Sequence, residues 1–65
     1  MQLQLNGEVV ETAAATLDAF LAEQGYADAV VATAVNGSFV AAPARLGLTL
    51  STGDQIEVLA PMQGG

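Results

Sequence analysis

The chain has 65 residues, of which seven are acidic and one is basic, so its net charge at pH 7 is −6. It contains neither cysteine nor histidine, which excludes disulfides and the common Cys/His metal sites. The acidic charge disfavours nucleic acids and anionic membrane surfaces, and no apolar run approaches the length of a membrane span. We therefore expect one cytoplasmic domain, residues 1–65, that works with protein partners.

Residues 1–12 predict a β-hairpin. Polar and apolar residues alternate on either side of Asn6-Gly7, the preferred pair for a two-residue type I′ turn. A turn of this length places Leu3 opposite Val10. Leu3, Leu5 and Val10 therefore share the face that we expect to cover the core.

Residues 17–24 predict one short helix. Thr16 is a good N-cap, and Gly25 can adopt the left-handed conformation that ends a helix. The apolar residues recur at the helical spacing i, i+3 and i+4, and they are Leu17, Phe20 and Leu21. A helix of this length is stable only when its apolar stripe packs on another element, so we expect it to cover one face of a sheet.

The middle of the chain predicts a second hairpin. Residues 30–35 predict an apolar strand, Asn36-Gly37 repeats the turn pair of the first hairpin, and residues 38–40 predict the returning strand. The first of these strands has apolar side chains on both faces, whereas one helix covers only one face of a sheet. We therefore expect part of the other face to be an exposed apolar surface that binds a partner.

The last third of the chain predicts irregular structure followed by a final strand. We expect a 3₁₀ turn near residues 43–46, with Arg45 as a solvated surface arginine. A turn at residues 51–54 leads into a strand at residues 55–60, whose inward side chains are Ile56 and Val58. The element order indicates an α+β fold in which a mixed sheet of four to five strands packs on one helix.

Residues 61–65 are the candidate functional segment. Pro61 discourages continuation of the strand, and Gly64 and Gly65 have the smallest cross-section that a peptide offers, so we expect a free, flexible tail that can thread a narrow channel. The Gly65 carboxylate is then an unhindered group for activation, because the chain has no lysine or cysteine side chain that could capture it. The alternative is an inert, frayed terminus. The expected partner-binding residues are Leu59, Pro61, Met62, Gln63 and Gly64.

The sequence shows no catalytic constellation. General acid–base chemistry usually recruits histidine, lysine or a tuned carboxylate, and the carboxylates here are scattered over turns and strand edges. No serine or threonine has an activating base nearby in the sequence, and no glycine-rich phosphate loop with its lysine is present. We therefore expect a protein on which enzymes act, with no catalytic residue, metal or cofactor of its own.

Several segments together resemble the ThiS family of sulfur carrier proteins, small ubiquitin-like β-grasp domains of thiamine biosynthesis. The resemblance implies that the first and last strands lie side by side in parallel. It departs from the family after the fourth strand, where members often carry Pro-Arg and this chain has Ala41-Ala42 before Pro43 and Arg45. The resemblance spans the whole chain and rests on the order of the Asn6-Gly7 hairpin, the Thr16-capped helix, Val35-Asn36-Gly37, Gly53-Asp54-Gln55-Ile56-Glu57-Val58 and the terminal Gly64-Gly65.

The resemblance also implies a mechanism and its partners. A ubiquitin-activating-type adenylyltransferase uses Mg-ATP to convert the Gly65 carboxylate to an acyl-adenylate. A sulfur donor, such as a cysteine desulfurase, then supplies the sulfur of a thiocarboxylate. Thiazole synthase accepts that sulfur while it builds the thiazole ring. The resemblance implies that Mg-ATP is bound by the activating enzyme and not by the carrier.

Three other functions remain open on the sequence. The small subunit of molybdopterin synthase, or another ubiquitin-like sulfur carrier, has the same tail chemistry and a different acceptor. A ubiquitin-like modifier would join Gly65 to an amine of a target protein. An inert β-grasp binding module, such as the RNA-associated regulatory kind, would leave the tail unused, although the acidic charge argues against RNA.

Overall fold

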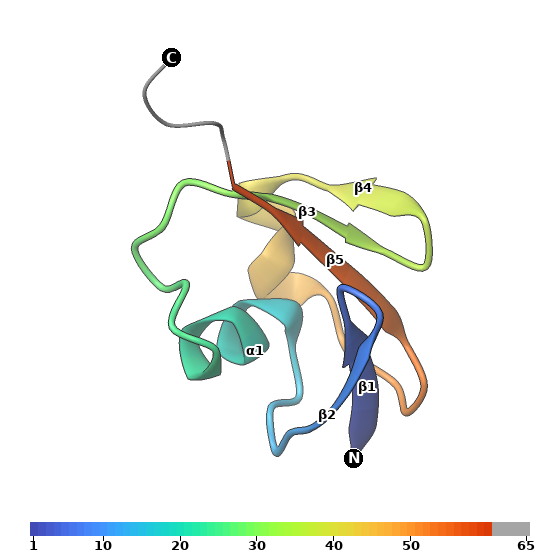
Figure 1. The fold of residues 1–65 in the computed structure, drawn as a ribbon. Helices are drawn as coiled ribbons and strands as arrows, with labels where there is room; N and C mark the ends of the chain where they lie inside the picture. The colour runs from blue at the N-terminus through green and yellow to red at the C-terminus, as the bar shows by residue number, and fades with distance from the viewer. Residues whose placement is uncertain (61–65) are drawn as a thin grey trace.

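A computed structural model of the chain describes residues 1–60, in which one helix packs on one face of a five-stranded mixed sheet (Figure 1). The predicted α+β fold with its mixed sheet is confirmed, whereas the predicted free tail, residues 61–65, lies outside the described residues. The elements in chain order are β1 (Gln2–Leu5), β2 (Glu8–Glu11), α1 (Leu17–Glu23), β3 (Ala32–Val35), β4 (Ser38–Val40), the 3₁₀ helix η1 (Ala42–Gly47) and β5 (Gln55–Leu59).

The last strand lies in the middle of the sheet. The strand order is β2-β1-β5-β3-β4, so β5 pairs with a strand on each side. It runs parallel to β1, with Gln4 opposite Gln55, and antiparallel to β3, with Thr33 opposite Val58. The parallel pairing of the first and last strands is the one that the β-grasp resemblance implied.

The two hairpins have the expected registers and turns. Leu3 lies opposite Val10 in the first hairpin. Asn6 and Gly7 have φ values of 51° and 86°, and Asn36-Gly37 repeats this pair with 51° and 84°. Type I′ turns require positive φ at both central positions, and asparagine and glycine are the residues that adopt it at least cost.

Helix α1 supplies three of the seven buried hydrophobic residues found in the described part of the chain. The Thr16 hydroxyl accepts a hydrogen bond from the backbone N–H of Ala19 at 3.2 Å and so caps the helix as predicted. The helix ends at Glu23, one residue before the expected end, and Gly25 follows with a φ of 91°. The buried hydrophobic residues are Leu3, Ala14, Leu17, Phe20, Leu21, Leu50 and Ile56, so the predicted helical stripe and the predicted sheet face meet in one core.

Two strands are shorter than the sequence predicted. The third strand begins at Ala32 instead of residue 30, because its neighbour β5 ends at Leu59, directly opposite Ala32. Val30 and Val31 therefore have no neighbouring strand to pair with, and Val30 is 81% exposed. Strand β5 ends at Leu59, one residue earlier than expected.

The segment before β5 is more ordered than the sequence predicted. Leu50 is buried, and its backbone N–H donates to the Ala15 carbonyl oxygen at 2.9 Å. The Leu48 carbonyl oxygen accepts from the Leu17 N–H at 3.0 Å, which satisfies one of the donors that a helix leaves free at its N-terminus. This short segment thereby closes the core at the start of α1.

Candidate functional site

The candidate site is the end of β5, where the described part of the chain meets the predicted tail. Leu59 is 72% exposed and points outward, as the alternation of the strand predicted. It pairs with Ala32 at the start of β3. The other predicted partner-binding residues, Pro61, Met62, Gln63 and Gly64, and the predicted attachment residue Gly65 lie outside the described residues.

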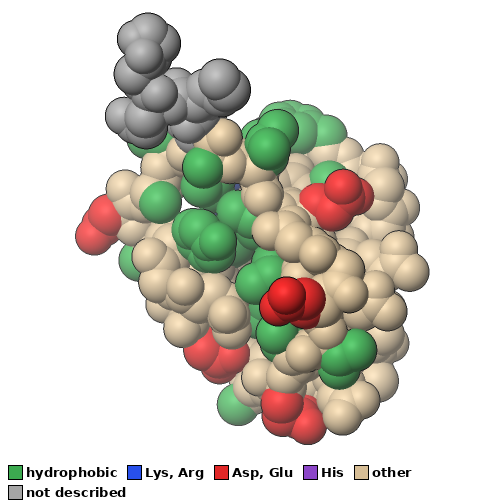
Figure 2. All heavy atoms as spheres, viewed as in Figure 1, with side chains coloured by type: hydrophobic (Ala, Val, Ile, Leu, Met, Phe, Trp, Pro, Cys, Tyr) green, Lys and Arg blue, Asp and Glu red, His purple; other side chains and the backbone are tan. Residues whose placement is uncertain are grey.

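A shallow apolar hollow of about 330 Å³ lies beside Leu59. An exposed apolar surface is therefore present at one end of the predicted strand 30–35, and its binding of a partner stays a prediction. Figure 2 shows that acidic side chains are spread over the face in view, with hydrophobic side chains gathered between them. The hollow is lined by Val30, Val31, Ala32, Leu59 and Ala60.

Arg45 supports this hollow and is not the solvated arginine that the sequence predicted. It is half-buried: its Nη2 donates to the Val31 carbonyl oxygen at 2.7 Å and its Nε donates to Thr33 Oγ1 at 3.0 Å. The Thr33 hydroxyl in turn donates to the Val40 carbonyl oxygen at 2.8 Å. A guanidinium group has several donors, and the Val31 carbonyl lies just outside the strand ladder, so the two groups satisfy each other. Arg45 thereby ties η1 to the backbone that lines the hollow.

The two turn asparagines hold β5 from its two sides. Asn6 Oδ1 accepts from the Val58 N–H at 2.9 Å, and Asn6 Nδ2 donates to the Val58 carbonyl oxygen at 3.3 Å. Asn36 Oδ1 accepts from the Gln55 N–H at 2.9 Å, while the Asn36 N–H donates to the Gln55 carbonyl oxygen at 2.7 Å. These contacts extend the sheet ladder past the ends of β1 and β3, so Asn36 holds the start of β5 and Asn6 holds the strand near its end.

Sequence reasoning identified both asparagines as turn residues and missed these contacts with β5. Asn6 and Val58 are 52 residues apart, and no local pattern records such a distant pairing. The turn's requirement for positive φ explains why asparagine is present at these positions. It gives no information about which backbone groups the asparagine side chain contacts.

Two acidic side chains of the described residues have structural partners. Asp54 accepts from the Ser51 N–H at 2.8 Å and from Asn36 Nδ2 at 3.0 Å, and Glu23 accepts from the buried Thr12 hydroxyl. Within residues 1–60, no three potential metal ligands gather at one place. The helices found there fall short of the length and hydrophobicity that crossing a bilayer requires. The described residues thus provide a rigid, largely apolar support at the base of the tail.

Known proteins share both the sequence pattern and the fold. The sequence model of the ThiS family matches residues 3–65. The crystal structure of a thiamine biosynthesis protein (ThiS) from Geobacter metallireducens is similar with a TM-score of 0.81 and 30% sequence identity, over 100% of both chains. No curated protein sequence gives a significant match. The family match therefore includes the predicted tail as well as the described residues.

Proposed function

Because this chain belongs to the ThiS family, we propose that it is a sulfur carrier of thiamine biosynthesis whose Gly65 carboxylate becomes a thiocarboxylate. The observation that carries this proposal is the extent of the family match, which reaches residue 65 and so includes Gly64-Gly65. The anchoring of β5 at the sheet centre supports it, because that strand leads directly into the tail.

The proposed chemistry activates the Gly65 carboxylate in a first step and introduces sulfur at its carbonyl carbon in a second. In the first step, a carboxylate oxygen of Gly65 attacks the α-phosphorus of ATP, and pyrophosphate leaves. In the second, the terminal sulfur of a donor persulfide, such as that of a cysteine desulfurase, attacks the acyl carbon and AMP leaves. A thiol then cleaves the new S–S bond, which frees the thiocarboxylate and leaves the thiol in a disulfide with the donor. Thiazole synthase then accepts the sulfur. The carrier is the substrate of each step and not its catalyst, and Mg-ATP binds to the activating adenylyltransferase.

The described residues would fix the position from which the five tail residues extend. Five residues beyond Ala60 can span at most roughly 17 Å, which is enough for a carboxylate to enter a deep active site while the folded part stays outside. Asn6 and Asn36 fix the strand from which that reach begins. Both cytoplasmic enzymes, the adenylyltransferase and the thiazole synthase, would then receive the same narrow Gly64-Gly65 end.

The proposal is tested by intact mass spectrometry. Incubation of the chain with its adenylyltransferase, ATP and a sulfur source should raise its mass by the difference between a sulfur and an oxygen atom. Fragmentation should place the change on Gly65. Transfer of that sulfur to thiazole synthase, and not to molybdopterin synthase, would identify the acceptor. An unchanged mass with an enzyme that activates another carrier in parallel would reject the proposal.

Replacing Leu59 with glutamate is expected to weaken binding to the adenylyltransferase by about tenfold or more, because a charge would enter an apolar contact beside the tail. Isothermal titration calorimetry measures the effect. Leu46→Glu is the matched control, since Leu46 in η1 is also 72% exposed and the substitution makes the same change in net charge. Equal affinities for the two variants would remove the Leu59 surface from the proposed interface.

A further inference from the structure

The sheet face that points away from α1, here called the outer face, carries a notch between two larger side chains. Glu57 on β5 lies opposite Ala34 on β3, and Ala34 lies opposite Phe39 on β4. Adjacent strands are about 4.8 Å apart, so the backbones that carry Glu57 and Phe39 are separated by roughly 10 Å with only a methyl group between them. Phe39 is 72% exposed, so its ring forms one open wall of the notch.

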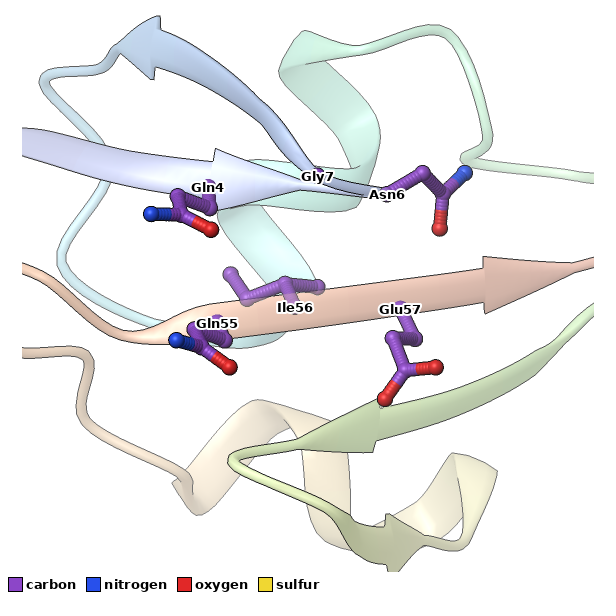
Figure 3. A pocket seen from close by; sticks show the side chains of 6 residues that line it. All are labelled: Gln4, Asn6, Gly7, Gln55, Ile56 and Glu57. Atoms are coloured by element: carbon purple, nitrogen blue, oxygen red, sulfur yellow. The ribbon is translucent and has the colours of Figure 1, made fainter.

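The opposite wall of the notch continues into a polar hollow of about 380 Å³ over β1 and β5. Gln4 and Gln55 lie opposite each other in the parallel pair and line this hollow with Glu57. Figure 3 shows these three side chains on the near face of the sheet, with α1 behind it and the Glu57 carboxylate extending toward β3. The Glu57 carboxylate therefore reaches over the Ala34 side of the notch, where its two oxygens can accept hydrogen bonds, while the two glutamine amides lie behind it over β1 and the start of β5.

No cation from the described residues neutralises this spot. The chain has a single lysine or arginine, which is Arg45, and its guanidinium binds Val31 and the buried Thr33. Thr33 alternates with Ala34 along β3, so Arg45 binds on the helix side of the sheet and not on the outer face. Within residues 1–60, the Glu57 side chain takes part in none of the hydrogen bonds or ion pairs.

We propose that this notch binds an arginine side chain of the activating adenylyltransferase. The inference rests on the proposed function, which supplies that partner. Glu57 presents two carboxylate oxygens to a guanidinium fork lying over Ala34, and Phe39 presents an aromatic face on the other side of Ala34, within stacking reach of its plane. A lysine would supply one point charge and would use the aromatic wall less well. The net charge of −6 further favours a basic surface.

The test measures affinity for the adenylyltransferase by calorimetry at low and at physiological ionic strength. Glu57→Gln should weaken binding by about tenfold at low salt and should reduce the salt dependence. Glu8→Gln is the matched control, because Glu8 is an exposed glutamate on edge strand β2 and its substitution makes the same change in net charge. This control should remain within about twofold of the unaltered chain.

A chemical footprint identifies the partner residue. Phenylglyoxal modifies accessible arginines, and the unaltered chain should protect one arginine of the adenylyltransferase that Glu57→Gln leaves exposed. Equal affinities for Glu57→Gln and Glu8→Gln, or protection of no arginine, would overturn the inference. If one of these outcomes occurs while the unaltered chain is still thiocarboxylated in the same preparation, only the notch is overturned. If the unaltered chain is neither bound nor modified, the proposed function falls as well.

Discussion

A single lysine appended after Gly65 is expected to abolish thiocarboxylation, reducing the modified fraction to background. One added residue moves the terminal carboxylate by about 3.3–3.6 Å along the chain. Enzymes bring reacting atoms to within roughly 3–3.5 Å, so a displacement of one residue places the carboxylate outside attacking range. The added residue also converts the Gly65 carboxylate into an amide, which cannot attack ATP as a carboxylate does. Intact mass spectrometry after incubation with the adenylyltransferase, ATP and a sulfur source measures the loss.

The appended lysine allows a control within the same preparation. Carboxypeptidase B removes a C-terminal lysine and leaves glycine, so treatment should restore the original end and the mass increase. Circular dichroism of the extended chain should match the unaltered chain, because the buried core described within residues 1–60 is retained in full. A thiocarboxylate formed on the appended lysine itself would show that the enzyme does not require the terminal carboxylate to be at the position of Gly65.

Replacing Phe20 with alanine is expected to lower the free energy of unfolding by about 3–5 kcal/mol, because Phe20 is fully buried where α1 meets the sheet. A domain of this length has a total stability of roughly 3–10 kcal/mol. A large fraction of the variant should therefore be unfolded at 37 °C. Urea unfolding followed by far-ultraviolet circular dichroism gives the change.

The matched control for this core substitution is Phe39→Ala, which removes the same atoms from a side chain that is 72% exposed. It should cost less than about 1 kcal/mol, as surface substitutions usually do. A comparable loss for the two phenylalanines would mean that burial under α1 is not what stabilises the domain.

The sequence predicted those parts of the fold that depend on neighbouring residues. Thr16 caps α1 because its hydroxyl needs only the next turn of backbone, and Asn6-Gly7 turns because of its own φ preferences. Leu59 was correctly placed outward, since strand alternation is a local property. The order of the helix and strands, and the outward orientation of Leu59 at the candidate site, could therefore be predicted from the sequence.

The remaining features depend on distant partners and could not be predicted from local patterns. Arg45 looked solvated because its acceptors, Val31 and Thr33, come from another element. The third strand looked two residues longer because its end is set by the length of β5 and not by its own valines. Leu50 looked irregular because its burial depends on the start of α1. The predicted tail residues lie outside the described residues, so their roles stay predictions.

The position of β5 between β1 and β3 affects how the protein is made. Before residue 55 has emerged from the ribosome, the nascent chain contains two separate hairpins. A lone two-stranded hairpin is at best marginally stable in water. Only β5 pairs with both hairpins, so the sheet cannot close until this strand has left the ribosome. A prematurely terminated product would stay unfolded and open to proteases, and the pool of compact molecules would thereby be cleared of those that lack the support for sulfur transfer.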